Sequence, residues 1–277
     1  MNNSIKICLS GLGRTGMQIA KYLIEQKQEF ELVSCVCSPS SGKAGKKLGE
    51  ILNCHDIDVP IYSSNDLEHC IFNTKPDVAI DFSNSTAALK NAEIFSKMKV
   101  NIVMGTTGFT KDEEEKLVSI VEKNKGAIIL APNITRGINA MMFLSNLAAK
   151  MLGGYDIEII EMHHNKKLDS PSGTAIKLAN ELKKFAELSK KSIPISSVRA
   201  GGIVGNHKIM IVGENDMIEI THQSFSRNAF AEGALFAANF IFDKTGIFEM
   251  KDAMNYKQII KDYLDEENNR KNKLVEV

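Results

Sequence analysis

The sequence has no excess of charge of either sign. Its 34 lysine and arginine residues balance 34 aspartate and glutamate residues among 277. Because no overall field attracts a polyanion, we expect neither nucleic acid nor an anionic membrane as a partner, and any attraction of a ligand must come from local charge. The apolar and charged fractions, 43% and 25%, are those of an ordinary soluble globular protein.

Long apolar runs and a regular cysteine pattern are missing as well. No segment approaches the roughly 20 apolar residues that cross a membrane, and the first residues, MNNSIKICLSGLG, do not have the pattern of a secretion signal. The five cysteines all lie in the first quarter of the chain, and an odd number without even spacing does not indicate a disulfide framework. These absences predict a cytoplasmic protein without structural disulfides.

Short β-branched runs and helical patterns alternate over the first 130 or so residues. Continuous apolar strands separated by helices are typical of a parallel sheet covered on both faces, so we expect a doubly wound, Rossmann-like α/β domain. The expected strands are residues 5–10, 31–37, 77–83, 101–107 and 127–133, and the expected helices are residues 14–26, 85–98 and 111–124.

The pattern changes after Pro132. Residues 156–164 predict a strand, and residues 207–213 and 217–224 predict an antiparallel hairpin around the turn-forming ENDM. Long helices are expected over about residues 138–152 and from about Ser172 onward. We therefore expect a second, α+β domain with a mixed or antiparallel sheet.

A glycine-rich segment, GLGRTG at residues 11–16, follows the first strand and opens the first helix. Gly11 allows a tight turn, Gly13 lets the backbone approach a pyrophosphate, and Gly16 permits close packing of the helix. The helix N-terminus adds N–H donors and partial positive charge. Between a strand and a helix, this motif predicts a dinucleotide cofactor rather than a plain structural turn.

The end of the second strand indicates which dinucleotide is bound. NAD enzymes usually carry an acidic residue there for the ribose 2′-hydroxyl, but this sequence continues CSPSSGKAGKK from residue 37, with Ser38 and Lys43 and no carboxylate. Hydroxyls and an ammonium group can bind a 2′-phosphate. NADPH is therefore favoured, and use of NADH stays open.

Two more strand ends face the same crevice. Phe82 lies in DFSN, and Gly105, Thr106 and Thr107 lie in GTTGF. Each segment taken alone is also compatible with plain turn and cap chemistry. Because ligands of open α/β sheets bind beyond the carboxyl ends of the strands, we expect these residues to contact the nicotinamide and ribose.

Residues 161–175, EMHHNKKLDSPSGTA, concentrate polar side chains at the end of an expected strand. Adjacent histidines do not easily chelate one ion, and no further ligand pair accompanies them, so we expect no metal. Ser172, Gly173 and Thr174 stand where a helix begins. Their hydroxyls either only cap that helix or, together with its N–H groups, form a pocket for a carboxylate.

Reference pKa values separate the roles of the charged residues. At pH 7 a lysine with a pKa of ~10.4 is almost fully protonated, whereas a histidine with a pKa of ~6.5 is about a quarter protonated. Lys167 therefore suits anchoring of a carboxylate or, with a lowered pKa, proton donation, and a histidine suits proton transfer near neutrality. Arg227, in SFSRNAF, offers a second cation for a dicarboxylate substrate.

These motifs together carry a family resemblance. The pattern E-x-H-H-x-x-K-x-D-x-P-S-G-T-A, together with VRAGGIVGNH, ITHQSFSRNAFAEGAL, GTTGF and GLGRTG, closely resembles the 4-hydroxy-tetrahydrodipicolinate reductase (dihydrodipicolinate reductase) family of lysine and diaminopimelate biosynthesis. The resemblance covers about residues 5–255. It implies a dinucleotide-binding domain at residues 1–132 and 245–277, and a domain at residues 133–244 that binds substrate and builds a homotetramer.

The resemblance also implies a reaction and its residues. NAD(P)H would deliver hydride to a cyclic, unsaturated, dicarboxylated imine derived from 4-hydroxy-tetrahydrodipicolinate, giving tetrahydrodipicolinate after loss of water. His163 and Lys167 would be the proton-donor pair. The residues implied to hold the substrate carboxylates are His164, Lys167, Ser172, Gly173 and Thr174. Those implied to contact the cofactor are Gly11, Gly13, Arg14, Thr15, Gly16, Met17, Gly105, Thr106, Thr107, Ala131, Pro132, Asn133 and Ile134.

Some positions depart from the family pattern, and two other functions compete. The usual N-F-S after the fifth strand is NIT here, followed by Arg136, and Cys37 stands where many members have an acidic residue.

One alternative function is that of a paralogous imine or amino-acid dehydrogenase with the same fold. The other is a non-catalytic dinucleotide sensor, which would not need the intact His163 and Lys167.

Overall fold

The structure is a computed structural model that describes residues 4–26, 28–185 and 192–275. The chain divides into two compact units. The first unit comprises Met1–Gly16, Gln26–Pro132 and Leu235–Val277, and the second comprises Met17–Glu25 and Asn133–Ala234.

The first unit is built on a parallel sheet of seven strands. Their order is β11-β6-β5-β4-β1-β2-β3, and every neighbouring pair runs parallel. The strands are β1 (Ile5–Ser10), β2 (Phe30–Cys37), β3 (Ile61–Ser63), β4 (Val78–Asp81), β5 (Asn101–Met104), β6 (Ala127–Leu130) and β11 (Gly246–Glu249). The order 3-2-1-4-5-6 of the first six strands is that of the doubly wound dinucleotide-binding fold, which confirms the expected fold class.

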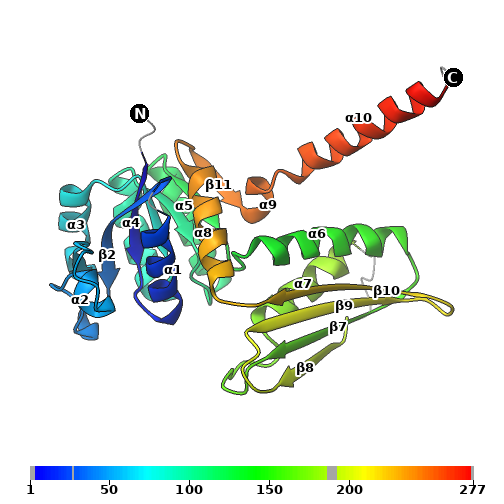
Figure 1. Cartoon of the computed structure of the whole chain (residues 1–277), viewed down its shortest axis with the longest axis horizontal. Helices are drawn as coiled ribbons and strands as arrows, with labels where there is room; N and C mark the ends of the chain where they lie inside the picture. Colours follow the sequence, from blue (N-terminus) through cyan, green and yellow to red (C-terminus); the bar gives the residue numbers. More distant parts are fainter. Residues whose placement is uncertain (1–3, 27, 186–191, 276–277) are drawn as a thin grey trace. The chain divides into compact units, whose positions relative to one another are not determined.

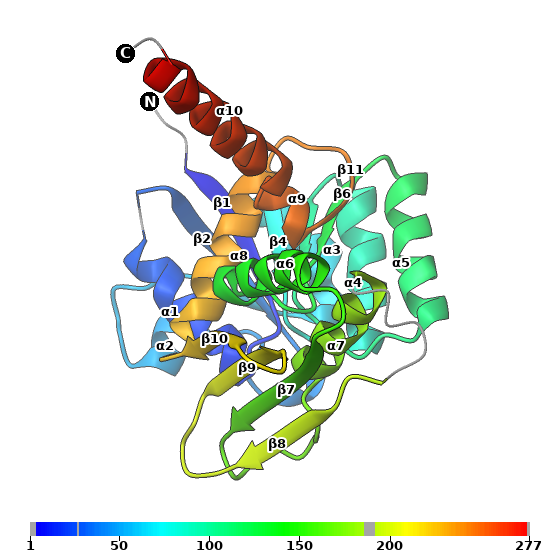
Figure 2. The same ribbon diagram turned by 90° about the vertical axis from the view of Figure 1, so that its right-hand side faces the viewer.

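Three helices pack on one face of this sheet. They are α3 (Leu67–Thr74), α4 (Ser85–Lys97) and α5 (Lys111–Lys123), and α4 and α5 lie side by side (Figure 2). Apolar residues of these helices, such as Phe95 and Leu117, form one buried cluster with strand residues such as Ile102. Burial of this continuous apolar surface is the main driving force for the layer.

Polar residues at the strand ends start the next helices. The Asn84 side chain accepts a hydrogen bond from the backbone N–H of Ala87, and Thr110 and Glu113 form a capping box at the start of α5. Such caps satisfy backbone donors that have no partner inside the helix. The expected strands at residues 77–83, 101–107 and 127–133 were therefore too long, because their last residues form these loops and caps.

Other short elements were not expected from the sequence. β3 and β11 are edge strands of three and four residues, too short to show a hydrophobic period. Helix α1 (Arg14–Glu25) is the helix expected at residues 14–26. The other helices are α2 (Leu48–Leu52), α8 (Asn228–Ile241), α9 (Met250–Ala253) and α10 (Tyr256–Val275), with single turns at Pro39–Ser41 and Ser64–Asp66. Within the described residues, no helix is long and apolar enough to cross a membrane.

The second unit contains a mixed sheet of four strands in the order β10-β9-β7-β8. The strands are β7 (Asp156–His163), β8 (Ile195–Arg199), β9 (Gly205–Val212) and β10 (Met217–Ser224). β9 and β10 form the expected antiparallel hairpin, β9 also pairs antiparallel with β7, and β7 and β8 run parallel. The expectation of a second α+β domain with a mixed sheet is confirmed.

Helices α6 (Arg136–Met151) and α7 (Gly173–Phe185) lie on one face of this second sheet (Figure 1). Their apolar residues form a cluster with strand residues such as Ile159 and Ile209. Burial alternates along β7, so that Ile157, Ile159, Glu161 and His163 all point to the buried side. The buried face of β7 thus changes from apolar to charged and polar at its carboxyl end.

Candidate active site

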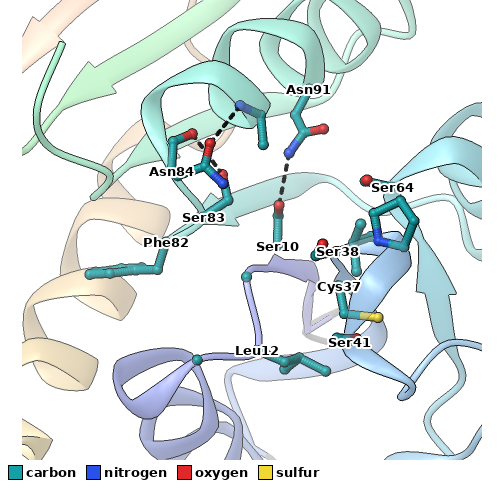
Figure 3. Close-up of a pocket in the computed structure, with 15 residues that line it drawn as sticks. Ser10, Leu12, Cys37, Ser38, Ser41, Ser64, Phe82, Ser83, Asn84 and Asn91 are labelled. Atoms are coloured by element: carbon teal, nitrogen blue, oxygen red, sulfur yellow. Dashed lines mark hydrogen bonds between the residues drawn. The ribbon is translucent and has the colours of Figure 1, made fainter.

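A cavity of about 360 Å³ lies at the carboxyl ends of the strands in the first unit (Figure 3). Its walls combine glycine backbone, hydroxyl and amide side chains and apolar groups. The lining residues are Ser10, Gly11, Leu12, Gly13, Val36, Cys37, Ser38, Pro39, Ser41, Ser64, Phe82, Ser83, Asn84, Ala87 and Asn91. Such a crevice at the switch in strand order is where doubly wound folds bind nucleotides.

The three glycines of GLGRTG meet different constraints. A Cβ on Gly16 would lie 1.8 Å from the Gly11 carbonyl oxygen, and Gly11 itself has φ +94° and touches the Phe82 backbone. Side chains at these two positions are excluded by the fold alone. At Gly13 a Cβ would meet nothing within 4 Å, so the protein leaves open space there beside the cavity. That open space fits the close approach of a pyrophosphate to the backbone.

The polar loops around the cavity are tied to one carboxylate. Asp81 is fully buried, and its Oδ1 accepts hydrogen bonds from the Ser83 hydroxyl at 2.6 Å and the Thr106 hydroxyl at 2.7 Å. The Asn91 amide donates to Asp81 Oδ2 and to the Ser10 hydroxyl, both at 3.1 Å. Asp81 therefore holds the ends of β1, β4 and β5 in fixed positions.

The end of β2 carries hydroxyls and a lysine. Cys37 and Ser38 line the cavity, and the Lys43 ammonium donates to the carbonyl oxygen of Leu12, at 2.6 Å. The ammonium is thus held beside the glycine-rich loop. Hydroxyl groups and a positive charge therefore lie close to this end of β2.

Only some of the residues predicted to bind the cofactor line this cavity. Gly11, Gly13, Ser38 and Phe82 line the cavity, and Gly105 contacts the Phe82 ring, because a Cβ on Gly105 would lie 2.4 Å from it. Thr107 is exposed, and Ala131 is bound through its N–H to the Met104 carbonyl. The residues that do not line this cavity are Arg14, Thr15, Gly16, Met17, Lys43, Gly105, Thr106, Thr107, Ala131, Pro132, Asn133 and Ile134.

A second cluster of polar residues lies at the carboxyl end of β7 in the second unit. Strand pairing places His163 of β7 beside Arg199 of β8, and Glu161 of β7 beside His207 of β9. The His163 and His207 rings are 5.2 Å apart, edge to face. Three neighbouring strands therefore bring two histidines, a carboxylate and a guanidinium together.

Glu161 is the centre of this cluster. It is fully buried, and Arg199 binds both its oxygens, with Nη1 donating to Oε2 at 2.9 Å and Nη2 donating to Oε1 at 2.6 Å. His163 Nδ1 lies 2.5 Å from Oε2, and the Ser172 N–H donates to Oε1 at 3.1 Å. The carboxylate thus receives donors from two strands and from the start of α7.

Burial and these partners shift the pKa values in different directions. Burial alone would raise the pKa of Glu161, but hydrogen bonds from Arg199, Ser197 and His163 lower it to about 2. Burial lowers the pKa of His163, and Glu161 partly opposes that shift. Burial, with the nearby His163 and His222, lowers the pKa of His207 to about 3. At neutral pH, Glu161 is therefore an anion and His207 is neutral.

Lys167 lies on the loop after β7 and is paired with Asp169. Its Nζ lies 2.8 Å from Asp169 Oδ1, and its side chain is 23% exposed. Burial acts to raise the pKa of Asp169, but the hydrogen bond from Lys167 and those from backbone N–H groups, including that of Gly173, lower it. Lys167 and the Gly173 N–H therefore already stabilise a carboxylate of this chain.

The Ser-Gly-Thr segment forms the start of α7, as expected. Ser172 Oγ accepts from the Ala175 N–H at 3.2 Å and lies 3.3 Å from His207 Nε2, so this buried hydroxyl caps the helix. Gly173 is exposed and leaves room for a ligand. Thr174 Oγ1 accepts from the Asn133 side chain at 3.0 Å, which links two segments predicted to bind different ligands.

The structure does not bring every predicted substrate residue into the cluster. His164 is half-buried just after β7, and among the described residues the hydrogen-bond partners of the Glu161 carboxylate are His163, Ser172 and Arg199. Arg227 is exposed, and the described part of the chain contains no ion pair of its side chain with the cluster. Any role of these two residues in binding a substrate therefore stays a prediction.

Sequence reasoning missed four polar residues that organise the two sites. Asp81, Glu161, Arg199 and His207 were not predicted, although each lies inside a quoted motif. A signal was present for Glu161, because residues two apart on a strand share a face and His163 was already a candidate. For Arg199 and His207, only the pairing of β8 and β9 with β7 reveals the proximity.

Two family profiles match the chain. Residues 5–134 match the profile described as "Dihydrodipicolinate reductase, N-terminus", and residues 137–254 match "Dihydrodipicolinate reductase, C-terminus". Among curated proteins, a 4-hydroxy-tetrahydrodipicolinate reductase from Methanocaldococcus jannaschii is 35% identical over 272 residues, covering 92% of this chain and 99% of the relative. One from Buchnera aphidicola subsp. Baizongia pistaciae is 36% identical, covering 91% of this chain and 98% of the relative.

A solved structure agrees with the sequence relatives. The dipicolinate-bound dihydrodipicolinate reductase from Paenisporosarcina sp. TG-14 superposes with a TM-score of 0.74 at 29% identity. The superposition covers 89% of this chain and 98% of that one. The similarity therefore extends over both units and is not confined to the dinucleotide-binding motif.

Proposed function

The chain belongs to the dihydrodipicolinate reductase family, and we propose that it reduces 4-hydroxy-2,3,4,5-tetrahydrodipicolinate, with loss of water, to 2,3,4,5-tetrahydrodipicolinate. Members of this family use a nicotinamide cofactor and act on a small molecule. The observation that carries the proposal is the buried pairing of His163 with Glu161 close to the Lys167 loop. A dinucleotide sensor has no need for such a pair.

The second unit supplies the groups for a dicarboxylate substrate. Lys167 and the Gly173 N–H already stabilise the Asp169 carboxylate, so the same donors suit a carboxylate of the substrate. The α7 N-terminus adds partial positive charge there. Thr174, His164 and Arg227 are the further side chains that we assign to substrate binding.

Proton transfer is assigned to His163 and Lys167. Because Glu161 is an anion bound to Nδ1, the free ring nitrogen of His163 is Nε2, and the negative carboxylate stabilises the ring when it is protonated. Lys167 supplies a second proton and a positive charge. The two residues thus combine a group that changes its protonation state with a group that holds an anion.

The cavity of the first unit fits a dinucleotide. Its open space at Gly13, its hydroxyl groups and the glycine-rich loop match the needs of a pyrophosphate and a ribose. When bound, the cofactor supplies the hydride for the reduction. Residues 1–132 and 245–277 are the part of the chain that we assign to cofactor binding, and residues 133–244 the part that we assign to substrate binding and assembly.

We propose NADPH as the preferred cofactor, because Ser38 and the Lys43 ammonium replace a carboxylate at the end of β2. Lys43→Ala should raise KM for NADPH about tenfold and leave KM for NADH nearly unchanged, since one charge-assisted hydrogen bond contributes about 1.5–3 kcal/mol. Steady-state kinetics with both cofactors measure this. Lys46→Ala, a nearby exposed lysine, is the matched control. Equal losses with NADH and NADPH would contradict the assignment.

We further propose a cytoplasmic homotetramer, as the family resemblance implies, and the surface of the second unit supports the assembly into an oligomer. Val198 on β8 and Met217 and Ile218 on β10 are large apolar side chains with 40%, 47% and 44% exposure. β8 and β10 are the two edge strands of this sheet, and apolar side chains exposed there suit packing against another subunit. Light scattering after size exclusion measures the molar mass, and four times 30.6 kDa is the expected value.

A coupled assay tests the reaction itself. Aspartate semialdehyde, pyruvate and the preceding synthase generate the substrate, and oxidation of NADPH is followed by absorbance. We expect oxidation that depends on every component. Loss of the signal with an active synthase would refute the proposed function and favour an imine or amino-acid dehydrogenase of the same fold.

A further inference from the structure

We propose that Glu161 and Arg199 are a pair of positioning residues that hold His163 in one tautomer and fix the loop that carries Lys167. This inference rests on the proposed function, because it assigns His163 and Lys167 to proton transfer. It adds to that function two residues that contact neither substrate nor cofactor and act only through the proton-transfer pair.

The first step is that Glu161 must be ionised. Its side chain is fully buried, and its two oxygens receive both Nη atoms of Arg199 and the Ser172 N–H. A protonated carboxylic acid would place a proton against one of these donors. The bidentate guanidinium therefore keeps Glu161 as a carboxylate.

The second step follows for His163. An ionised carboxylate only accepts hydrogen bonds, so His163 Nδ1, 2.5 Å from Glu161 Oε2, must carry the proton. Nε2 is then the ring nitrogen that can exchange a proton with a substrate. A Cβ on residue 205 would come 3.3 Å from Nε2, so Gly205 keeps a side chain away from that nitrogen.

Arg199 connects this histidine to the Lys167 loop. Besides Glu161, its Nη2 donates to the backbone carbonyl of Asp169 at 2.7 Å, and its Nη1 donates to that of Val198 at 2.8 Å. Asp169 is the residue whose carboxylate binds the Lys167 ammonium. One guanidinium therefore fixes both members of the proton-transfer pair, which come from a strand and from a loop.

The planar fork of arginine is essential to this arrangement. Lysine carries the same charge but is a point donor and cannot bind both carboxylate oxygens in parallel and two carbonyls at the same time. Arg199→Lys therefore keeps the charge and removes the geometry. Glu161→Gln keeps the shape of the side chain and removes the charge, and its amide can serve as donor or acceptor to Nδ1, so that both tautomers of His163 become possible.

The matched control lies in the same sheet. Lys208 and Glu219 form an ion pair between β9 and β10 at 3.0 Å, with partly exposed side chains. Lys208→Ala and Glu219→Gln remove an ion pair of the second unit without touching His163. A general loss of folding would affect both sets of variants, whereas loss of positioning affects only Glu161 and Arg199.

The first measurement reads the tautomer directly and does not need activity. The chain has six histidines, so nitrogen NMR of protein labelled in its histidine rings is tractable, and His163→Gln identifies the His163 signal. We expect a proton on Nδ1 in the wild type and a mixture of tautomers in Glu161→Gln. A wild-type His163 protonated on Nε2 alone at neutral pH would overturn the proposal, whatever the reaction of the enzyme.

The second measurement is kinetic. Glu161→Gln and Arg199→Lys should lower kcat about 100-fold, the lower end of what acid–base catalysis contributes, with KM for NADPH within a factor of two. In the plot of kcat against pH, the transition that reports protonation of His163 should move to lower pH in Glu161→Gln, because the carboxylate no longer stabilises the protonated ring. The other charged or titratable groups around that ring, Arg199, His207 and Lys167, are still present in this variant.

The outcomes separate this proposal from the proposed function. If the wild-type protein is inactive in the coupled assay, the proposed reaction is refuted. The NMR measurement of the His163 tautomer then still tests whether Glu161 and Arg199 position that ring. If the wild-type protein is active and the folded Glu161→Gln and Arg199→Lys variants keep kcat within a factor of two, the positioning role is refuted and the proposed reaction is not. A 100-fold loss in Arg199→Lys with normal kcat in Lys208→Ala supports it.

Discussion

Each unit is organised around one fully buried carboxylate, but the two carboxylates have different partners. Asp81 in the first unit accepts hydrogen bonds from the neutral side chains of Ser83, Asn91 and Thr106. Glu161 in the second unit binds a guanidinium and an imidazole. Both satisfy the rule that a buried charge needs a complete set of donors.

The difference in partners indicates a difference in role. Neutral hydroxyls and amides do not titrate near neutral pH, so the Asp81 network can only hold loops in place. The Glu161 network contains His163, a titratable ring whose pKa is lowered by burial and partly restored by Glu161, and the carboxylate orients that ring. A buried carboxylate thus holds the walls of a cavity in one unit, and under the proposed function it positions a proton-transfer group in the other.

The largest expected effect is a loss of turnover when the residues near the second carboxylate are replaced. His163→Ala or Lys167→Ala should lower turnover about 10²- to 10⁴-fold, because each removes a proton-transfer group. NADPH binding, measured by fluorescence titration, should stay nearly intact, since neither residue lines the cavity of the first unit. Lys166→Ala, an exposed neighbour of Lys167, is the control. Wild-type turnover in either variant would show that the residue is wrongly assigned.

A smaller effect is expected at the first carboxylate, where a substitution should weaken NADPH binding and leave kcat nearly unchanged. Asp81→Asn replaces an acceptor by an amide, so that one donor, such as the Asn91 amide, faces another donor. Leaving a buried donor unsatisfied costs about 1–3 kcal/mol. We expect a lower free energy of unfolding and about tenfold weaker NADPH binding, with kcat at saturating NADPH within a few-fold of wild type.

Denaturant unfolding and cofactor titration measure these two quantities. Asp77→Asn is a useful comparison, because Asp77 lies in the same unit and its carboxylate accepts a hydrogen bond from the exposed Lys6 N–H. If Asp81→Asn lowered kcat as strongly as His163→Ala, the distinction between a loop-fixing and a proton-controlling carboxylate would fail.

The two carboxylates also show what the sequence could predict. Strands β1, β2, β4, β5 and β6 and helices α1, α4 and α5 followed from hydrophobic periodicity, whereas β3, β11 and α3 did not. A nucleotide cavity was expected from GLGRTG in its place between strand and helix. The side-chain partners of Asp81 lie between residues 83 and 106 of the chain, and those of Glu161 extend from residue 163 to residue 199. Spacing along one strand places Glu161 on the face of His163, but it does not say which strands are neighbours. The order β9-β7-β8 therefore could not be read from local patterns.

The smallest expected effect concerns the pH dependence of stability in the second unit. His207 has a pKa of about 3 in the folded protein, because burial and nearby positive charge oppose protonation, and an ordinary value of about 6.5 when unfolded. Between these values the unfolded chain binds a proton that the folded chain does not. His207 therefore lowers the free energy of unfolding by about 1.4 kcal/mol per pH unit as pH falls from 6.5 towards 3.

His207→Gln removes this titration and keeps a neutral polar side chain. Urea unfolding at pH 7, 6 and 5 should show a stability loss on acidification that is smaller than that of wild type by about 0.7 kcal/mol between pH 7 and 6 and about 1.2 kcal/mol between pH 6 and 5. His55→Gln, at an exposed histidine of the first unit, separates this effect from the simple loss of a histidine. The remaining slope between pH 7 and 5 in His207→Gln reports His163 and His222, whose pKa values are also lowered. An unchanged slope in His207→Gln would mean that His207 takes up a proton in the folded state, and the second cluster would then hold one more positive charge beside His163.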